Sequence, residues 1–198
     1  MIRRFIGKPT ESALAAFAGA LDRRNVSPNT LTLLGLIVSF GAAWAYYAGH
    51  VLAGGLIVLF SGLFDMLDGA VARAGGRASP LGAFLDSVVD RYADFVVFGG
   101  ILLRYAATGD VPGTLLVLAI LLGSLQVSYV RARAELVIPK CAVGLMERPE
   151  RILLLAAGSL FGFLEIALWA LAILTHLTAL YRIYYTFRES RRTPRDPA

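Results

Sequence analysis

Four aspartates lie in two otherwise apolar stretches that are long enough to be membrane helices. Asp65 and Asp68 are three residues apart and Asp86 and Asp90 are four apart, so each pair would share one face of a helix. An ionised carboxylate at membrane depth is costly unless it is paired, and four of them close together would repel one another. Because Mg²⁺ and Mn²⁺ prefer carboxylate oxygens, the two pairs predict a site for one or two such ions.

The aspartates belong to a longer pattern, D-x2-D-G-x2-A-R-x8-G-x3-D-x3-D, which the sequence matches without a departure. Its fixed positions are Asp65, Asp68, Gly69, Ala72, Arg73, Gly82, Asp86 and Asp90. The pattern resembles the signature of the CDP-alcohol phosphotransferase family. The resemblance implies that the first three aspartates hold divalent metal, two ions per site, at the pyrophosphate of a CDP-alcohol. It also implies that Asp90 completes the site and is the general base, although from the residues alone Asp90 fits a pure metal ligand equally well.

An alternative from another class is a divalent-cation transporter or a proton relay, which would also keep aspartates inside the membrane. The Gly69, Ala72, Arg73 and Gly82 elements argue against it, since a metal path does not need them.

The composition indicates an integral membrane protein. The chain has 198 residues, of which 57% are hydrophobic, and a mean hydropathy of +0.66. A spanning helix needs about 20 apolar residues, and six stretches approach this length. They are residues 30–49, 52–72, 82–107, 112–136, 148–164 and 166–186. We therefore expect an all-α membrane protein with six transmembrane helices, whose catalytic domain covers residues 30–187.

Residues 1–29 are expected to form an interfacial segment, and residues 188–198 a basic cytoplasmic tail. Within residues 10–24 an apolar stripe suits an amphipathic helix that lies in the membrane interface. The stripe consists of Leu14, Phe17, Ala18 and Leu21. A cytosolic cap helix would show the same stripe. No cleavable signal peptide is apparent.

Lys and Arg gather on one side of the predicted spans. The connections near residues 50, 110 and 163 contain none, whereas both ends of the chain and the connections near residues 75 and 140 are rich in them. The positive-inside rule then places both termini and the aspartates on the cytoplasmic side of the cell membrane. This arrangement explains the net charge of +5 better than nucleic-acid binding does. Cys141 is the single cysteine, so neither a disulfide framework nor a thiolate metal site is expected. His50 and His176 have no partner at ligand spacing and are predicted to be structural.

The resemblance implies that a phosphatidyl or archaetidyl group passes from CDP-diacylglycerol or CDP-archaeol to an acceptor hydroxyl, with release of CMP. Arg73 would donate to phosphate oxygens, and the small residues would let the nucleotide approach the helix backbone or would serve close helix packing. The predicted CDP-binding residues are Asn29, Asp65, Asp68, Gly69, Ala72, Arg73, Gly82 and Asp86. Asn29 lies in a Ser-Pro-Asn-Thr run, so capping of the first span is its alternative role.

Two charged residues follow the signature. Arg91 is expected to be the ion-pair partner of Asp90, and Asp94, one turn further, is expected to face Arg91 or a basic loop residue. We assign Asp94 no catalytic role.

A second basic cluster lies at the predicted ends of the fourth and fifth spans, in the strings Ser-Tyr-Val-Arg-Ala-Arg-Ala-Glu and Glu-Arg-Pro-Glu-Arg. Cations that converge from two helix ends predict a phosphate-binding patch beside the metal site, although headgroup anchoring would also place cations there. The strings look like the branch of the family that transfers to inositol phosphate, either to phosphatidyl or to archaeal ether lipids. Carried over, the acceptor-phosphate residues are Ser128, Arg131, Arg133, Arg148 and Arg151.

Arg182 or Arg188 is a further candidate for the acceptor site. Glycerol 3-phosphate, with phosphatidylglycerophosphate as the product, is the nearest alternative acceptor. Family resemblance also implies a homodimer that forms through membrane helices.

Overall fold

The structure of the protein, a computed structural model, describes the backbone of residues 8–192 and the side chains of residues 15–192. Every regular element within this range is a helix, as expected. The helices are α1 (Lys8–Arg23), α2 (Pro28–Tyr47), α3 (Val51–Ala74), α4 (Pro80–Ala107), α5 (Val111–Ala134), α6 (Arg148–Leu160) and α7 (Leu164–Ser190). Residues 1–7 of the predicted interfacial segment, the Leu14 side chain and residues 193–198 of the predicted tail lie outside the described residues.

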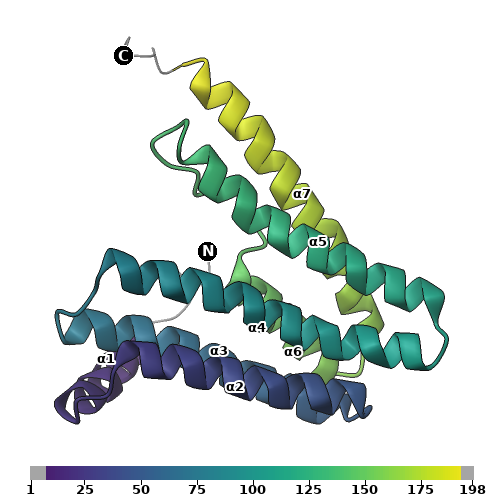
Figure 1. Cartoon of the computed structure of the whole chain (residues 1–198), viewed down its shortest axis with the longest axis horizontal. Coiled ribbons are helices and arrows are strands. Elements are labelled where there is room, and N and C mark those ends of the chain that lie inside the picture. The colour runs from purple at the N-terminus through teal and green to yellow at the C-terminus, as the bar shows by residue number, and fades with distance from the viewer. Residues whose placement is uncertain (1–7, 193–198) are drawn as a thin grey trace.

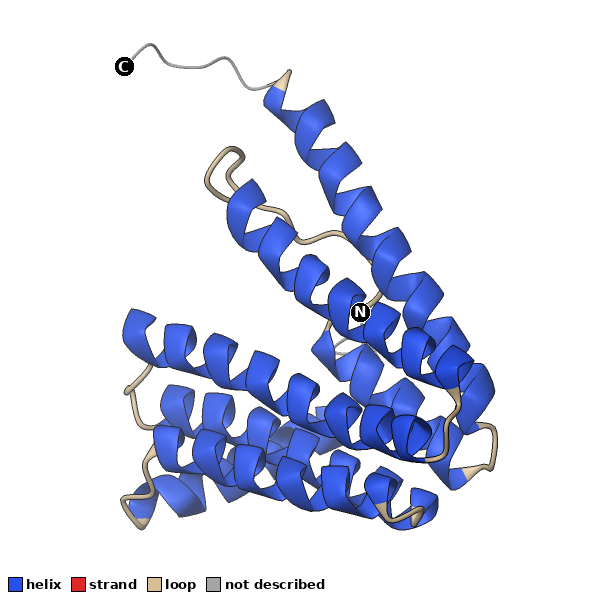
Figure 2. Ribbon diagram, turned by 45° about the vertical axis from the view of Figure 1, so that its right-hand side comes forward, coloured by secondary structure: helices blue, strands red, loops and turns tan. Residues whose placement is uncertain are grey.

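The helices form two groups. α2, α3 and α4 lie together with α6 packed on α3, and α1 crosses one end of this group (Figure 1). α5 and α7 form a second pair that leans away from the first group (Figures 1 and 2). α4 and α5 are close where they are connected and diverge toward their other ends. The molecule is therefore closed at one end and open at the other, where α4 begins and α5 ends.

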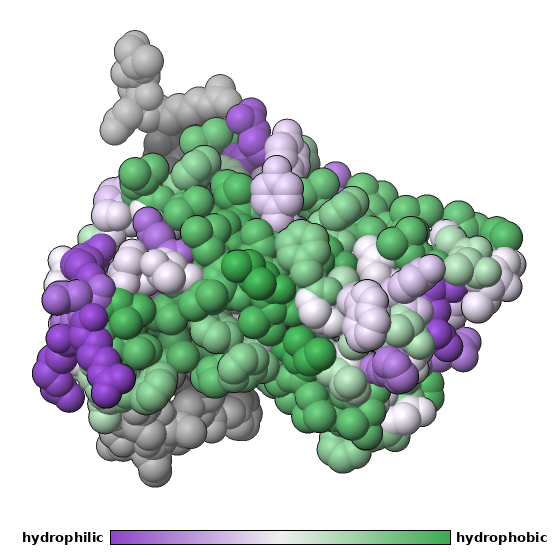
Figure 3. Space-filling model, turned by 60° about the horizontal axis from the view of Figure 1, so that its bottom comes forward, coloured by the Kyte–Doolittle hydropathy of each residue, from purple (hydrophilic) through white to green (hydrophobic). Residues whose placement is uncertain are grey.

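Within residues 8–192, four helices are long and apolar enough to cross a membrane, namely α2, α3, α5 and α7. The surface fits this, since apolar side chains cover most of the face in Figure 3 and hydrophilic ones gather toward its left and right edges. The protein is therefore a multi-pass membrane protein.

The other two predicted spans differ from these four. α4 is long but interrupted by charges, and α6 has 13 residues, which at about 1.5 Å per residue fall short of a bilayer core. The predicted span 148–164 begins where α6 begins but extends past its end. The count of six spans stays a prediction.

Local sequence explains where two of the helices begin. Ser79 Oγ accepts a hydrogen bond from the Gly82 N–H at 3.0 Å, and Pro80 opens α4. Asp110 caps α5 through the Gly113 N–H at 2.9 Å. At α2, Ser27 is in the N-cap position without a side-chain cap hydrogen bond, and Asn29 already lies inside the helix. The capping role considered for Asn29 is therefore wrong.

The closed end holds the main apolar core. Phe98, Ile120 and Leu168 bring α4, α5 and α7 together there, each with at most 2% of its surface exposed. Gly100 of α4 lies against the backbone of Ala43 in α2, where no larger residue would fit. The predicted metal-binding aspartates and the arginine that contacts two of them lie at the open end.

The helix α1 packs on α3 through Ala18 and Leu21, whereas Phe17 is exposed. Its last turn is tied to the α3–α4 connection by an ion pair between Asp22 and Arg77. These contacts hold α1 across the open end. Whether α1 lies in a membrane interface stays a prediction.

The two histidines predicted to be structural and the single cysteine are not part of the carboxylate group that Asp65, Asp68 and Asp86 form. Cys141 is buried and unpaired, and the His176 ring contacts the Ala119 carbonyl of α5 at 3.0 Å. His50 precedes α3 at the closed end.

Candidate active site

Three of the predicted metal ligands lie together at the open end. One carboxylate oxygen from each of Asp65, Asp68 and Asp86 lies within 4.8 Å of the other two. Thr32 of α2 donates a hydrogen bond to Asp68 Oδ2 at 2.6 Å, and both residues are buried. Asp86 Oδ1 is buried and has no hydrogen-bond partner. A buried carboxylate oxygen without a partner, next to two further carboxylates, fits a hard divalent cation.

Asp90, the fourth predicted ligand, is paired with an arginine. Arg148, at the start of α6, contacts Asp90 and also reaches Asp65 Oδ1 at 2.6 Å. Its side chain is only 8% exposed. The α6 helix thus brings a buried positive charge between α3 and α4, which offsets part of the negative charge of the cluster.

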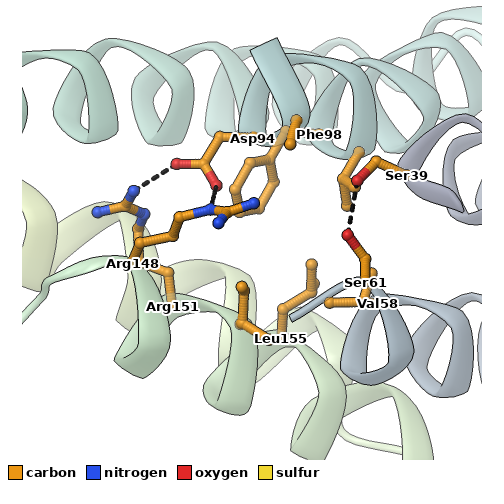
Figure 4. A pocket seen from close by; sticks show the side chains of 11 residues that line it. Ser39, Val58, Ser61, Asp94, Phe98, Arg148, Arg151 and Leu155 are labelled. Carbon is orange, nitrogen blue, oxygen red and sulfur yellow. Dashed lines mark hydrogen bonds and ion pairs between the residues drawn. The ribbon is translucent and has the colours of Figure 1, made fainter. Parts of the chain in front are cut away.

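Asp94 connects α4 to α6 one turn beyond Asp90. It accepts from Arg151 and lies 3.6 Å from Arg148 Nε, and Figure 4 shows its carboxylate between the two guanidinium groups. The small void beside it, about 20 Å³, is bordered on its far side by the hydrogen-bonded Ser39 and Ser61.

The predicted pairing of Arg91 with Asp90 is wrong. Arg91 donates to the Ser87 carbonyl and forms no ion pair with any residue in the range 15–192. Successive residues point about 100° apart around a helix, so Arg91 turns away from the face that carries Asp90 and Asp94. The four-residue spacing of Asp86, Asp90 and Asp94 indicates that these three side chains share the face of α4 that meets the arginines of α6.

A first cavity, the α3–α4 cavity, has a volume of about 430 Å³ and opens beside the carboxylates. It is lined by Ser27, Pro28, Asn29, Thr32, Asp68, Gly69, Ala72, Arg73, Arg77, Ala78, Ser79, Gly82, Ala83 and Asp86. Every residue predicted to bind CDP lines it except Asp65, which belongs to the adjoining carboxylate cluster. Ser27, Arg77 and Ser79 were missed because Ser27 lies before the first predicted span and the other two occupy unspecified positions of the signature between Arg73 and Gly82.

A second cavity, the α4–α5 cavity, lies where these two helices diverge and has a volume of about 730 Å³. Five arginines and three carboxylates line it, together with apolar side chains. The charged members are Arg91, Arg131, Arg148, Arg151, Arg182, Asp90, Glu135 and Glu147. Ser128 also lines the cavity, so four of the five predicted acceptor residues meet there.

Arg133 is the exception among the predicted acceptor residues. It is exposed and does not line the α4–α5 cavity. It lies two positions after Arg131, which places it on another side of α5. Its assignment stays a prediction.

The arginines of this cavity are held by different partners. Arg131 contacts Glu135 at 3.2 Å and Glu147 at 3.4 Å. Arg182 of α7 contacts Glu147 at 2.9 Å and donates to the Val127 and Val143 carbonyls, each at 2.7 Å. In the sequence only the single charge of Arg182 within an otherwise uncharged stretch marked it out.

The carboxylate cluster lies between the two cavities. Asp86 lines the α3–α4 cavity, and Asp90, one helical turn later, lines the α4–α5 cavity. A group held in one cavity therefore meets a group held in the other at these aspartates. Such an arrangement suits the transfer of a group between two separately bound substrates.

Comparison with known proteins agrees with the signature. The family model for CDP-alcohol phosphatidyltransferase matches residues 25–181. The chain belongs to this family. It is thus a transferase, and the transporter alternative is set aside.

Two curated relatives illustrate the branch that the chain is similar to. Archaetidylinositol phosphate synthase of Methanothermobacter thermautotrophicus is 39% identical, and the match covers 84% of this chain and 86% of the relative. Phosphatidylinositol phosphate synthase of Streptomyces avermitilis is 42% identical, and the match covers 89% of this chain and 79% of the relative.

Solved structures of phosphatidylinositol phosphate synthase from Mycobacterium tuberculosis have the same fold. The structure with bound CDP-DAG is 31% identical with a TM-score of 0.81, and the match covers 93% of this chain and 98% of that one. The complex with manganese and citrate is 32% identical with a TM-score of 0.82, and it covers 93% of each chain.

Proposed function

We propose that this transferase moves a phosphatidyl or archaetidyl group from CDP-diacylglycerol or CDP-archaeol to a hydroxyl of inositol phosphate, with release of CMP. The observation that carries the proposal is the carboxylate cluster between two cavities, one beside the family signature and the other rich in arginine. The names of the relatives support the choice of substrates.

The α3–α4 cavity is the proposed site of the CDP moiety. Arg73 is exposed at its wall and presents a planar fork of donors that suits phosphate oxygens. Gly69, Ala72 and Gly82 leave room for the nucleotide against α3 and α4, and Asn29 offers an amide from α2.

The carboxylate cluster is the proposed site of two Mg²⁺ or Mn²⁺ ions, held by Asp65, Asp68, Asp86 and Asp90. Bound there, the metal supplies charge neutralisation to the pyrophosphate and to the departing CMP. Thr32 fixes the orientation of Asp68 for this task. The relative with bound manganese supports this choice of metal.

Asp90 is the proposed general base, because it alone of the four aspartates lines the α4–α5 cavity. It takes the proton of the attacking hydroxyl, whose oxygen forms a bond to the lipid-linked phosphorus. The bond between the two phosphates breaks, and its electrons leave with CMP.

The α4–α5 cavity is the proposed acceptor site. Ser128, Arg131, Arg148, Arg151 and Arg182 provide the hydrogen-bond donors of its wall. Arg148 and Arg151 already hold aspartates of α3 and α4. Arg131 and Arg182, whose shared partner Glu147 is 41% exposed, are therefore the cations best placed for an acceptor phosphate. A cationic wall of this kind favours an acceptor that already carries phosphate.

We further propose that six helices, α2 to α7, lie in the membrane within a catalytic domain of residues 30–187. The first residues of the short α6 line the polar α4–α5 cavity. A helix that begins at such a cavity inside the membrane can be shorter than one that crosses the whole bilayer core. Both termini and the site would face the cytoplasm, with residues 1–29 in the interface and 188–198 as a basic tail. A homodimer through membrane helices is part of the proposal, and crosslinking in native membranes tests it.

The decisive experiment measures CMP release by the purified protein with Mg²⁺ or Mn²⁺ and either CDP-lipid. Inositol 1-phosphate, glycerol 3-phosphate, serine and free inositol are offered in parallel. We expect release with inositol 1-phosphate. Release with glycerol 3-phosphate alone would overturn the acceptor and keep the chemistry, and no release with any acceptor would overturn the proposal.

A further inference from the structure

Glu147 lies at the N-cap position of α6 but does not cap it. Its backbone is extended there, and its side chain makes no hydrogen bond to the first turn of the helix. Glutamate is also not among the residues that N-caps favour. The reason for a carboxylate at this position must therefore lie elsewhere, and its side chain points to the α4–α5 cavity, which it lines.

The Glu147 carboxylate bridges two arginines from different helices. Its Oε1 atom lies 3.4 Å from Arg131 Nη1 on α5 and 2.9 Å from Arg182 Nη2 on α7. One anionic oxygen between two guanidinium groups is also the contact that a phosphate oxygen would make. The carboxylate thus stands where a bound phosphate would be held.

Arg182 is fixed in this bridge, whereas Glu147 can leave it. The Arg182 side chain is 2% exposed and is anchored by the Val127 and Val143 carbonyls. The Glu147 side chain is 41% exposed to the cavity. An incoming anion can therefore turn Glu147 outward without moving the arginine.

The other cations of the cavity have no such replaceable partner. Arg148 and Arg151 pair with aspartates of α3 and α4 that are at most 23% exposed. Arg91 donates to the Ser87 carbonyl and has no carboxylate among the described residues to give up, and Arg131 keeps Glu135 in reach when Glu147 leaves. Among the residues 15–192 that line this cavity, only the bridge between Arg131 and Arg182 offers two donors whose anion can be exchanged.

We propose that Glu147 is a specificity-determining residue that occupies the place of the acceptor phosphate and is displaced by it. A phosphate dianion has more charge and more acceptor oxygens than the carboxylate, so it regains both contacts. A neutral polyol cannot, because its hydroxyls would leave the two arginines without an anion. Glu147 thus excludes unphosphorylated acceptors. This inference rests on the proposed function.

The test is the binding of inorganic phosphate to the purified protein, measured by titration calorimetry without CDP-lipid. Glu147→Gln keeps the shape of the side chain and removes the competing charge, so we expect phosphate to bind about three- to tenfold more tightly than to the wild type. Glu189→Gln is the matched control, since it removes one half-buried charge near the end of α7 that does not line the cavity, and it should leave phosphate affinity unchanged.

Unchanged or weaker phosphate binding by Glu147→Gln would overturn the inference and show that Glu147 only holds Arg182 in place. An equal gain in Glu189→Gln would overturn it too, since the effect would then be one of net charge. If Glu147→Gln does not fold, Glu147→Asp withdraws the carboxylate by one methylene and should give a smaller gain in the same direction. Because no turnover is needed, a wild type that is inactive with inositol 1-phosphate would defeat the proposed function without touching this comparison.

Discussion

The two cavities differ in how their charged groups are engaged. In the α3–α4 cavity, Arg73 forms no ion pair with any residue of the range 15–192, and Asp86 has an oxygen without a partner. In the α4–α5 cavity, four of the five arginines already contact a carboxylate. The first site is thus ready to receive metal and phosphate, whereas the second must exchange one anion for another.

This contrast has a physical origin in the elements that build each cavity. α3 and α4 follow one another in the chain, and their neighbouring carboxylates repel one another. Arg148 contacts Asp65 and Asp90 and so offsets only part of this charge. The wall of the α4–α5 cavity comes from four elements, α4 to α7, and the buried arginines there need partners from neighbouring helices. Metal should therefore control the first site, and competition between anions should control the second.

The largest effect is expected from Asp86→Asn, which removes one charge from the metal ligands. We expect the rate of CMP release to fall by more than ~100-fold. This loss is larger than the loss expected when the changed residue only hydrogen-bonds to a metal ligand. Mn²⁺ binding should weaken in parallel, while size-exclusion chromatography still shows a folded protein. Glu165→Gln, an exposed change at the closed end, is the control. Activity within about tenfold of the wild type would remove Asp86 from the metal site.

An intermediate effect is expected from Arg131→Ala in the α4–α5 cavity. The acceptor KM should rise by about tenfold to a hundredfold, because this ratio corresponds to the free energy of one hydrogen bond to a charged group. The KM for CDP-lipid should stay unchanged, because Arg131 is remote from the α3–α4 cavity. Steady-state kinetics with each substrate varied in turn measure both values, and Arg192→Ala, an exposed change in the turn just after α7, serves as the control. An equal rise in both KM values would mean that the two cavities do not act separately.

The smallest effect is expected from Gly69→Val, which narrows the α3–α4 cavity. A Cβ at this position would lie 3.2 Å from Arg73 Nη1, at the end of a flexible side chain, so the helix should tolerate it. The larger side chain would take space from the nucleotide and raise the CDP-lipid KM about tenfold without changing the acceptor KM. Gly99→Val, where a Cβ meets open space, is the matched control. A higher acceptor KM instead would exchange the assignments of the two cavities.

The helical fold followed from the sequence because long apolar runs have few other solutions in a membrane. The predicted span 52–72 corresponds closely to Val51–Ala74, whereas the predicted span 148–164 becomes a helix that ends at Leu160. Hydropathy does not mark this end because residues on both sides of Gly162 are apolar. α1 and α6 show that amphipathic or short helices are placed by the surfaces they pack on.

The sequence by itself determined which aspartates form the carboxylate cluster and which residues of the signature line the α3–α4 cavity. These residues lie on α3 and α4. Helix periodicity alone fixes which side chains share a face of each helix. Only the tertiary structure decided that Arg148 meets Asp65 and Asp90, that Arg91 does not, and that Glu147 joins Arg131 to Arg182. These partners lie on separate helices far apart in the chain. A buried charge pairs with whichever opposite charge the packing of helices brings within reach, and no local spacing records that choice.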